Sequence, residues 1–141
     1  MAKKKVFVSF DYEDDRHFRN LLKAWDANPN FDFHISDLTP GEINTWDISK
    51  IKEALTKAIR QATYTLVIVG KNANTLHPKS SEIGYKNWIN FEIAKSKAER
   101  NKLVGVKIDK SYESPDELLN AGASWAMSFT PETILKALND A

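Results

Sequence analysis

Short apolar runs alternate with amphipathic segments along this 141-residue chain. The run at 64–69 (YTLVIV) is the most apolar, as expected of a strand that is covered on both faces. The runs at 5–10 (KVFVSF) and 103–108 (LVGVKI) have the same character. Parallel strands need crossover connections, which are usually helices. The alternation of such runs with helical patterns therefore predicts a parallel α/β sheet.

The predicted elements form five strand–helix pairs. Two further strands are expected at 31–35 (FDFHI), where apolar and polar residues alternate as at a sheet edge, and at 125–129. With right-handed crossovers, this order predicts one domain over 1–141. Its fold should be a flavodoxin-like three-layer sandwich, with a five-stranded parallel sheet of order 2-1-3-4-5 and helices on both faces. The helices are expected at about 11–26, 46–62, 87–100, briefly from 114, and from 131 to the C-terminus.

Local signals predict how these helices begin and which faces they bury. Asp11–Asp15 places acids where they meet the positive end of a helix dipole. Ser114-Pro115 and Thr130-Pro131 each pair a capping side chain with a proline at the first helical position. Pro40-Gly41 predicts a turn in the loop 36–45. The first helix is expected to bury a stripe made of Phe18, Leu21, Leu22 and Trp25.

Composition excludes several classes of function. The chain is 42% hydrophobic and 28% charged, and its net charge of +1 gives no reason to expect binding to nucleic acid or to an anionic membrane. The absence of cysteine excludes disulfides, thiolate metal sites and a cysteine nucleophile. No apolar run approaches the roughly 20 residues that span a bilayer, and none resembles the core of a signal peptide. We therefore expect a cytoplasmic protein.

Common nucleotide and metal motifs do not occur in the sequence. Neither GxxxxGK[ST] nor GxGxxG is present. His17, His34 and His77 lack the spacing of metal ligands, so no metal is expected. A phospho-receiver shares the predicted fold but needs an aspartate after the third strand, where this chain has Gly70-Lys71. A flavodoxin needs a Ser/Thr/Gly-rich phosphate loop after the first strand, where this chain has the acidic DYEDD.

The stretch NWINFEIAKS at 87–96 is the strongest candidate for a functional helix. A spacing of four places Trp88 and Glu92 on one face, one turn apart. The helix follows a long polar segment, 71–86, of the kind that is usually functional or disordered in a compact domain. We expect Glu92 to face a pocket that Trp88 helps to line. In this type of sheet, ligands bind beyond the carboxyl ends of the strands, and the segments expected there are 10–12, 36–46 and 70–86.

Three segments, in this order, resemble a TIR domain. VFVSFDYEDD is similar to the first box of that family, a strand that ends in Ser-Phe or Ser-Tyr before an acidic helix start. Residues 36–45, with the IKEALTKAIRQATYTLVIVG that follows, resemble the BB loop, second helix and third strand. WINFEI is similar to the W-x-x-x-E segment of TIR enzymes. More narrowly, SFDYEDD and the Trp-to-Glu spacing resemble the TIR-like proteins of bacterial Thoeris anti-phage systems.

The resemblance covers the chain to about Ile108 and implies an NAD-consuming enzyme. It identifies Glu92 as the catalytic residue that cleaves the nicotinamide–ribose bond, with NAD glycohydrolase or ADP-ribosyl cyclase activity. Thoeris-like members make a cyclic or conjugated ADP-ribose signal that activates a partner effector. The family also implies self-association for activity, and no cofactor, since NAD is the substrate. Matching positions that would bind NAD are Phe10, Asp11, Trp46, Gly70, Lys71 and Trp88, with Lys71 available to a phosphate.

Each assignment has a structural alternative. Most glutamates are solvated, although the apolar neighbours of Glu92 favour a pocket. Trp88 taken alone is more typical of a core residue, and Asp11 can serve only as a helix-start acid. The segment 71–86 and the short BB loop also depart from the family pattern. The alternative function is a non-enzymatic TIR-like adaptor or scaffold, but an adaptor has no need of the glutamate in W-x-x-x-E.

Overall fold

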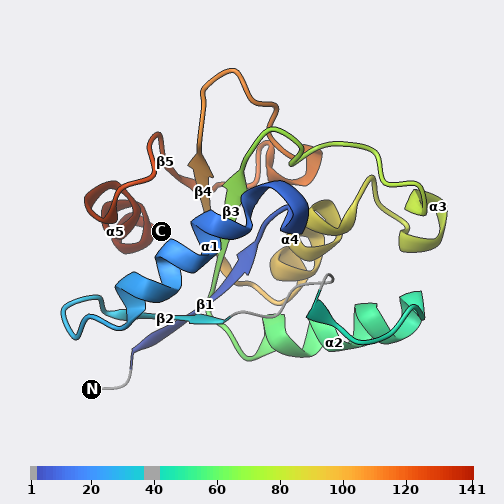
Figure 1. Ribbon diagram of the computed structural model, residues 1–141, viewed down its shortest axis with the longest axis horizontal. Coiled ribbons are helices and arrows are strands. Elements are labelled where there is room, and N and C mark those ends of the chain that lie inside the picture. Colours follow the sequence, from blue (N-terminus) through green and yellow to red (C-terminus); the bar gives the residue numbers. More distant parts are fainter. Residues whose placement is uncertain (1–2, 37–41) are drawn as a thin grey trace.

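The computed structural model describes residues 3–36 and 42–141, which form a five-stranded parallel sheet flanked by helices (Figure 1). The strand order is β2-β1-β3-β4-β5, with every neighbouring pair parallel. This confirms the predicted fold class, the strand order and the edge position of the second strand. The strands are β1 (Lys4–Ser9), β2 (Phe33–Ser36), β3 (Tyr64–Val69), β4 (Lys102–Lys107) and β5 (Ser124–Ala126).

Helices cover both faces of the sheet. Alternate side chains of β1 separate the two faces: Val6 and Val8 pack with α1 and α5, whereas Phe7 packs with α2 and α4. In β3, Val67 and Val69 likewise join a cluster that includes α4 and the turn after β4. The central strands are therefore apolar on both faces because both faces are covered. The helices are α1 (Tyr12–Asp26), α2 (Ile48–Arg60), α3 (Ser80–Ile83), α4 (Trp88–Ala98), the 3-10 helix η2 (Asp116–Leu118) and α5 (Pro131–Asp140).

The buried face of α1 differs from the predicted stripe. Leu22 is fully buried, but Leu21 is 44% exposed, so its predicted burial is wrong. Part of the inward face is polar instead, because Asp15 and Arg19 precede Leu22 by seven and three positions along the same helix surface. The Arg19 guanidinium reaches the carboxylate of Glu42 at 2.9 Å, which gives the buried charge a partner.

Several predicted boundaries need correction. The strand expected at 125–129 is shorter and lies at Ser124–Ala126. The helix expected from Ser114 is a single 3-10 turn that Pro115 precedes, and the Ser114 side chain makes no cap. Helix α2 begins at Ile48, where Asp47 caps it by accepting from the Lys50 N–H. The turn predicted at Pro40-Gly41 lies outside the described residues.

The polar segment 71–86 is ordered. It contains α3, and within it Ala73, Asn74 and Ile83 are buried. The final helix begins as predicted, with a Thr130–Thr133 capping box and Pro131 in the first turn. No helix in the described part of the chain is long and apolar enough to cross a membrane.

Candidate active site

Glu92 lies in the second turn of α4 and is almost completely buried, with 2% of its surface exposed. Helix α4 contacts α2, η2, β1, β3 and β4, which explains why polar as well as apolar side chains on it are buried. The Ser9 hydroxyl donates a hydrogen bond of 2.6 Å to Glu92 Oε1. Ser9 is the last residue of β1 and is itself fully buried. The hydrogen bond between Ser9 and Glu92 thus joins the end of β1 to the second turn of α4.

Burial dominates the acid–base behaviour of this carboxyl group. Removal from water raises the pKa of Glu92 to about 8, although the hydrogen bond from Ser9 favours the ionised form and opposes the increase. No ion pair to Glu92 occurs among the described residues. The resting carboxyl is therefore largely protonated at neutral pH, and an approaching cation would favour its ionisation.

A wide cavity of about 1040 Å³ opens beyond the carboxyl ends of β1 and β3. Its wall contains Phe10 and Asp11, which follow β1, and Trp88, which begins α4. This is where ligands bind in open parallel sheets. The lining residues come from four segments of the chain: 10–14, 42–51, 72–79 and 87–89.

The structure brings some of the predicted site residues together and not others. Phe10, Asp11, Trp46 and Trp88 all line the cavity. Trp46 is 92% exposed, so in this state its indole lies on the rim rather than in the interior. Glu92 is not part of the lining. It lies behind the wall, one helical turn from Trp88 and hydrogen-bonded to the residue before Phe10.

Gly70 and Lys71 lie away from the cavity lining. A Cβ atom on Gly70 would overlap the buried carboxylate of Asp15, so a larger residue here would displace that side chain of α1 from the end of β3. Lys71 is exposed. Their proposed roles in NAD binding therefore have no support from the lining of this cavity, and they stay predictions.

The side of the cavity formed by the start of α1 is acidic. Burial and the neighbouring Asp14 raise the pKa of Asp11. Asp15 lies behind these two acids, and its pKa is raised to about 6 by burial and by the charges of Asp11 and Asp14. Its Oδ2 atom has no hydrogen-bond partner among the described residues. Within this part of the chain, no group of three His, Asp or Glu residues is placed to hold a metal ion.

Two buried polar residues beside the cavity lining, Ser9 and Asp15, were not predicted from the sequence. Ser9 carried a usable signal, because a hydroxyl at the carboxyl end of a strand buried on both faces needs a hydrogen-bond partner. Asp15 carried none, since an acid in the first turn of a helix is usually solvated. Its burial depends on the close approach of Gly70, which is distant in the sequence.

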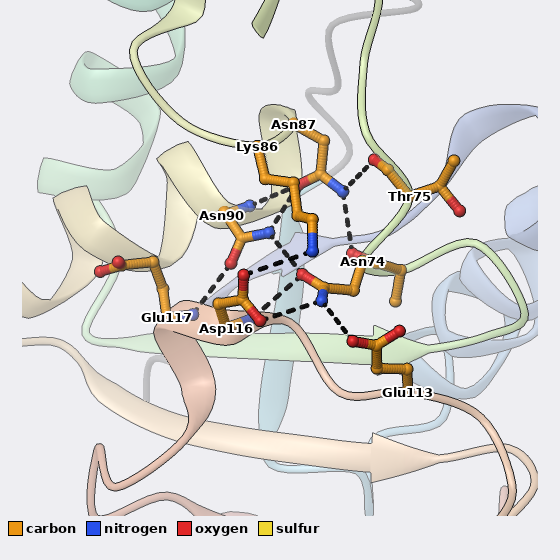
Figure 2. Close-up of polar contacts among 9 residues, drawn as sticks. Asn74, Thr75, Lys86, Asn87, Asn90, Glu113, Asp116 and Glu117 are labelled. Atoms are coloured by element: carbon orange, nitrogen blue, oxygen red, sulfur yellow. Dashed lines mark hydrogen bonds and ion pairs between the residues drawn. The ribbon is translucent and has the colours of Figure 1, made fainter.

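Three buried asparagines connect the start of α4 to the loop before it (Figure 2). The Asn87 amide donates to the carbonyls of Ala73 and Thr75, each at 3.0 Å, and its oxygen accepts from the Asn90 N–H. The Asn90 amide donates to the side-chain oxygens of Asn74 and Asn87, again at 3.0 Å. We call Asn74, Asn87 and Asn90 the asparagine cluster.

The same cluster also holds the turn that follows β4. The Asn90 oxygen accepts from the Glu117 N–H at 2.9 Å, and the Asn74 oxygen accepts from the Asp116 N–H at 3.1 Å. The Asn74 amide donates to the carboxylates of Glu113 and Asp116. All three side-chain NH₂ groups thus donate twice. A buried network that is fully satisfied favours a single arrangement of the segments that it joins.

Comparison with known proteins gives a family match and likenesses to several solved structures. The family model described as "Thoeris protein ThsB, TIR-like domain" matches residues 7–113. A 3-dehydroquinate dehydratase-like protein from Bifidobacterium longum is 16% identical, with a TM-score of 0.47, and the match covers 99% of this chain and 94% of that chain. The TIR domains of the activated Roq1 resistosome, which directly recognises the pathogen effector XopQ, are 23% identical, with a TM-score of 0.42. That match covers 76% of this chain and 60% of that chain. No curated protein sequence matches this chain significantly.

The raised pKa of Glu92 predicts a pH-dependent effect of Glu92→Gln on stability. The ordinary pKa of 4.5 applies to the unfolded chain, whereas the folded protein keeps this proton up to about pH 8. Between these values the folded state binds more protons, so its stability falls as pH rises, by at most about 1.4 kcal/mol per pH unit. Glutamine does not titrate. The Tm of Glu92→Gln relative to wild type should therefore increase steadily from about pH 5 to about pH 8 in thermal melts.

Glu99→Gln is the matched control for this measurement. Glu99 follows α4, pairs with Arg60 at 2.7 Å and keeps contact with solvent. Its substitution removes a carboxylate from the same region without removing a buried one, so it shows how much of the Tm difference comes from losing a surface carboxylate. Parallel curves for Glu92→Gln and wild type would show that Glu92 is not a buried carboxyl with a raised pKa.

The asparagine cluster predicts that Asn90→Ala loosens specific segments. The change removes the acceptor for the Glu117 N–H and the donor to the side-chain oxygens of Asn74 and Asn87. Each buried group left without a hydrogen bond lowers the stability by about 1–3 kcal/mol. Hydrogen exchange should accelerate most at 72–79 and 113–117. Asn101→Ala is the control, since its amide donates to the Ile59 carbonyl and the Thr65 hydroxyl. A uniform rise in exchange, equal in both variants, would contradict a specific role for the cluster.

Proposed function

This chain belongs to the TIR-like domain family of the Thoeris protein ThsB, and on that premise we propose that it is an enzyme that cleaves the nicotinamide–ribose bond of NAD. The observation that carries the proposal is a buried carboxyl group, Glu92, which is hydrogen-bonded to Ser9 and follows Trp88 by one helical turn. Phe10, the neighbour of Ser9, and Trp88 both line a large cavity. Burial of a carboxyl without a cationic partner costs stability. Such a cost is typical of a functional site.

The chemistry of NAD suits a single carboxylate. Nicotinamide leaves as a neutral molecule, because its positively charged ring nitrogen takes the electron pair of the breaking bond. No acid is needed to protonate it, in contrast to glycoside hydrolysis with two carboxyl groups. The ribose carbon becomes an oxocarbenium ion, and an anion placed beside it stabilises the transition state. Ionised Glu92 would supply that anion.

The cavity offers a consistent position for the nicotinamide end of the substrate. Asp11 and Asp14 give one side of the lining an acidic character that suits a cationic ring, and Phe10 and Trp88 offer aromatic surface for stacking. The positive ring, once bound, would favour the ionised form of Glu92. Trp88 is half-buried and packs edge-to-face on Phe91, one helical turn before Glu92. The proposal requires this indole to rotate so that the ribose can reach Glu92.

The ADP-ribosyl oxocarbenium ion left behind can be captured by water, which gives ADP-ribose, by a nucleophilic group of the same molecule, which gives a cyclic product, or by a nucleophile of a second molecule, which gives a conjugate. The family resemblance favours a cyclic or conjugated ADP-ribose product, which would act as a signal in anti-phage defence and activate a partner effector. Self-association and a cytoplasmic location, where NAD is available, belong to the same proposal. NAD is here a substrate, and the reaction as proposed uses no cofactor.

Nicotinamide release from NAD by wild type and by Glu92→Gln tests this function. The substitution keeps the size of the side chain but removes its charge, so the rate should fall by about two orders of magnitude or more. The reaction should be run with concentrated protein, with and without a phage-derived trigger, and the products separated by mass. A cyclic product is lighter than ADP-ribose by one water molecule.

Glu99→Gln again provides the control, because it changes the same chemical group at a position that pairs with Arg60 and keeps contact with solvent, whereas Glu92 is buried. Its rate should equal that of wild type. Equal rates for Glu92→Gln and wild type would remove Glu92 from the reaction. Intact NAD under every condition would favour the non-enzymatic adaptor.

A further inference from the structure

The loop between β3 and α4 forms a fixed wall of the cavity. Asn87 bonds to Ala73 and Thr75 on the first half of the loop, and the His77 N–H donates to the Lys86 carbonyl at 2.8 Å across its two halves. Side chains between these attachment points, at 75–79, line the cavity. A loop held in this way presents its side chains in a defined place, so it can recognise part of a ligand.

Charges on the cavity lining are divided between its segments. The acids lie at the start of α1 and at Glu42, whereas the loop contributes no carboxylate. Lys79 is the only lysine or arginine among the described residues that line the cavity. Its ammonium group has no hydrogen-bond or ion-pair partner within the described part of the chain. The loop is therefore the positive side of a cavity whose other side is acidic.

His77 adds an oriented donor beside this charge. Its Nδ1 atom accepts a hydrogen bond of 2.9 Å from the Lys79 N–H. An imidazole that accepts at Nδ1 carries its hydrogen on Nε2. The ring is thereby fixed, and its Nε2–H remains available as a donor on the cavity wall. Cationic and neutral donors side by side match the oxygens of a phosphate group.

We propose that His77 and Lys79 bind the diphosphate of the nucleotide substrate. The inference rests on the proposed function for the identity of the ligand. It adds the orientation of that ligand in the cavity. The cationic nicotinamide end is placed towards Asp11 and Asp14, and the anionic diphosphate towards the loop. The lysine that meets a phosphate is then Lys79 and not Lys71, which was expected from sequence but lies outside the cavity lining.

Calorimetric titration with ADP-ribose tests this inference without requiring catalysis. The probe has the diphosphate but no nicotinamide bond to cleave. Lys79→Gln should weaken its binding about tenfold or more, because one charge-assisted contact is lost. Lys71→Gln makes the same change on an exposed position of the same loop, and it should alter binding by less than about twofold. His77→Phe, which removes both the Nε2–H donor and the acceptor for the Lys79 N–H, should also weaken binding.

Adenosine serves as the ligand control, because it lacks phosphate and its binding should be the same for wild type and Lys79→Gln. The inference is overturned if Lys79→Gln binds ADP-ribose as wild type does, or if Lys71→Gln weakens binding equally. It is also overturned if wild type does not prefer ADP-ribose to adenosine. Glu92→Gln should bind ADP-ribose normally. If wild type releases no nicotinamide from NAD while it shows this binding pattern, the proposed reaction is removed and the diphosphate site stands.

Discussion

The burial of one carboxyl group governs the arrangement of this site. Glu92 would be solvated on an ordinary surface helix, but α4 is covered on most sides. Among the described residues, its carboxyl group has the Ser9 hydroxyl at the end of β1 as its one hydrogen-bond partner. That contact joins residues 83 positions apart and fixes α4 against the central part of the sheet. The penalty of burial appears as the raised pKa. Hydrophobic packing on both faces of the sheet offsets this penalty.

The surrounding structure keeps the buried carboxyl close to the cavity without exposing it. Phe10 and Trp88 stand in the wall, while the asparagine cluster sets the start of α4 relative to the loop after β3. The same cluster reaches the turn after β4. The carboxyl, the aromatic wall and the positive loop are thus parts of one connected framework.

Much of the fold was predictable because it depends on local patterns. The apolar runs predicted β3 and its neighbouring strands, and Thr130-Pro131 predicted the start of α5. Predictions failed where burial or a hydrogen bond depends on residues that are distant in the sequence. Leu21 is exposed because Arg19 and Asp15 occupy the inward face of α1, where Arg19 pairs with Glu42 and Asp15 packs closely against Gly70. The Trp–Glu spacing indicated Glu92, but no local pattern could indicate that Ser9 would be its partner.

The most direct test of the account is the pKa of the Glu92 carboxyl, measured by carbon-13 NMR on protein labelled at glutamate. The free protein should show a carboxyl that titrates near 8 and that Glu92→Gln removes. A carba analogue of NAD keeps the cationic ring but cannot form the oxocarbenium ion. Its binding should lower this pKa by about one or more, because the positive ring favours the ionised carboxyl. A pKa that stays near 8 with the analogue bound, or one near 4.5 in the free protein, would contradict the account.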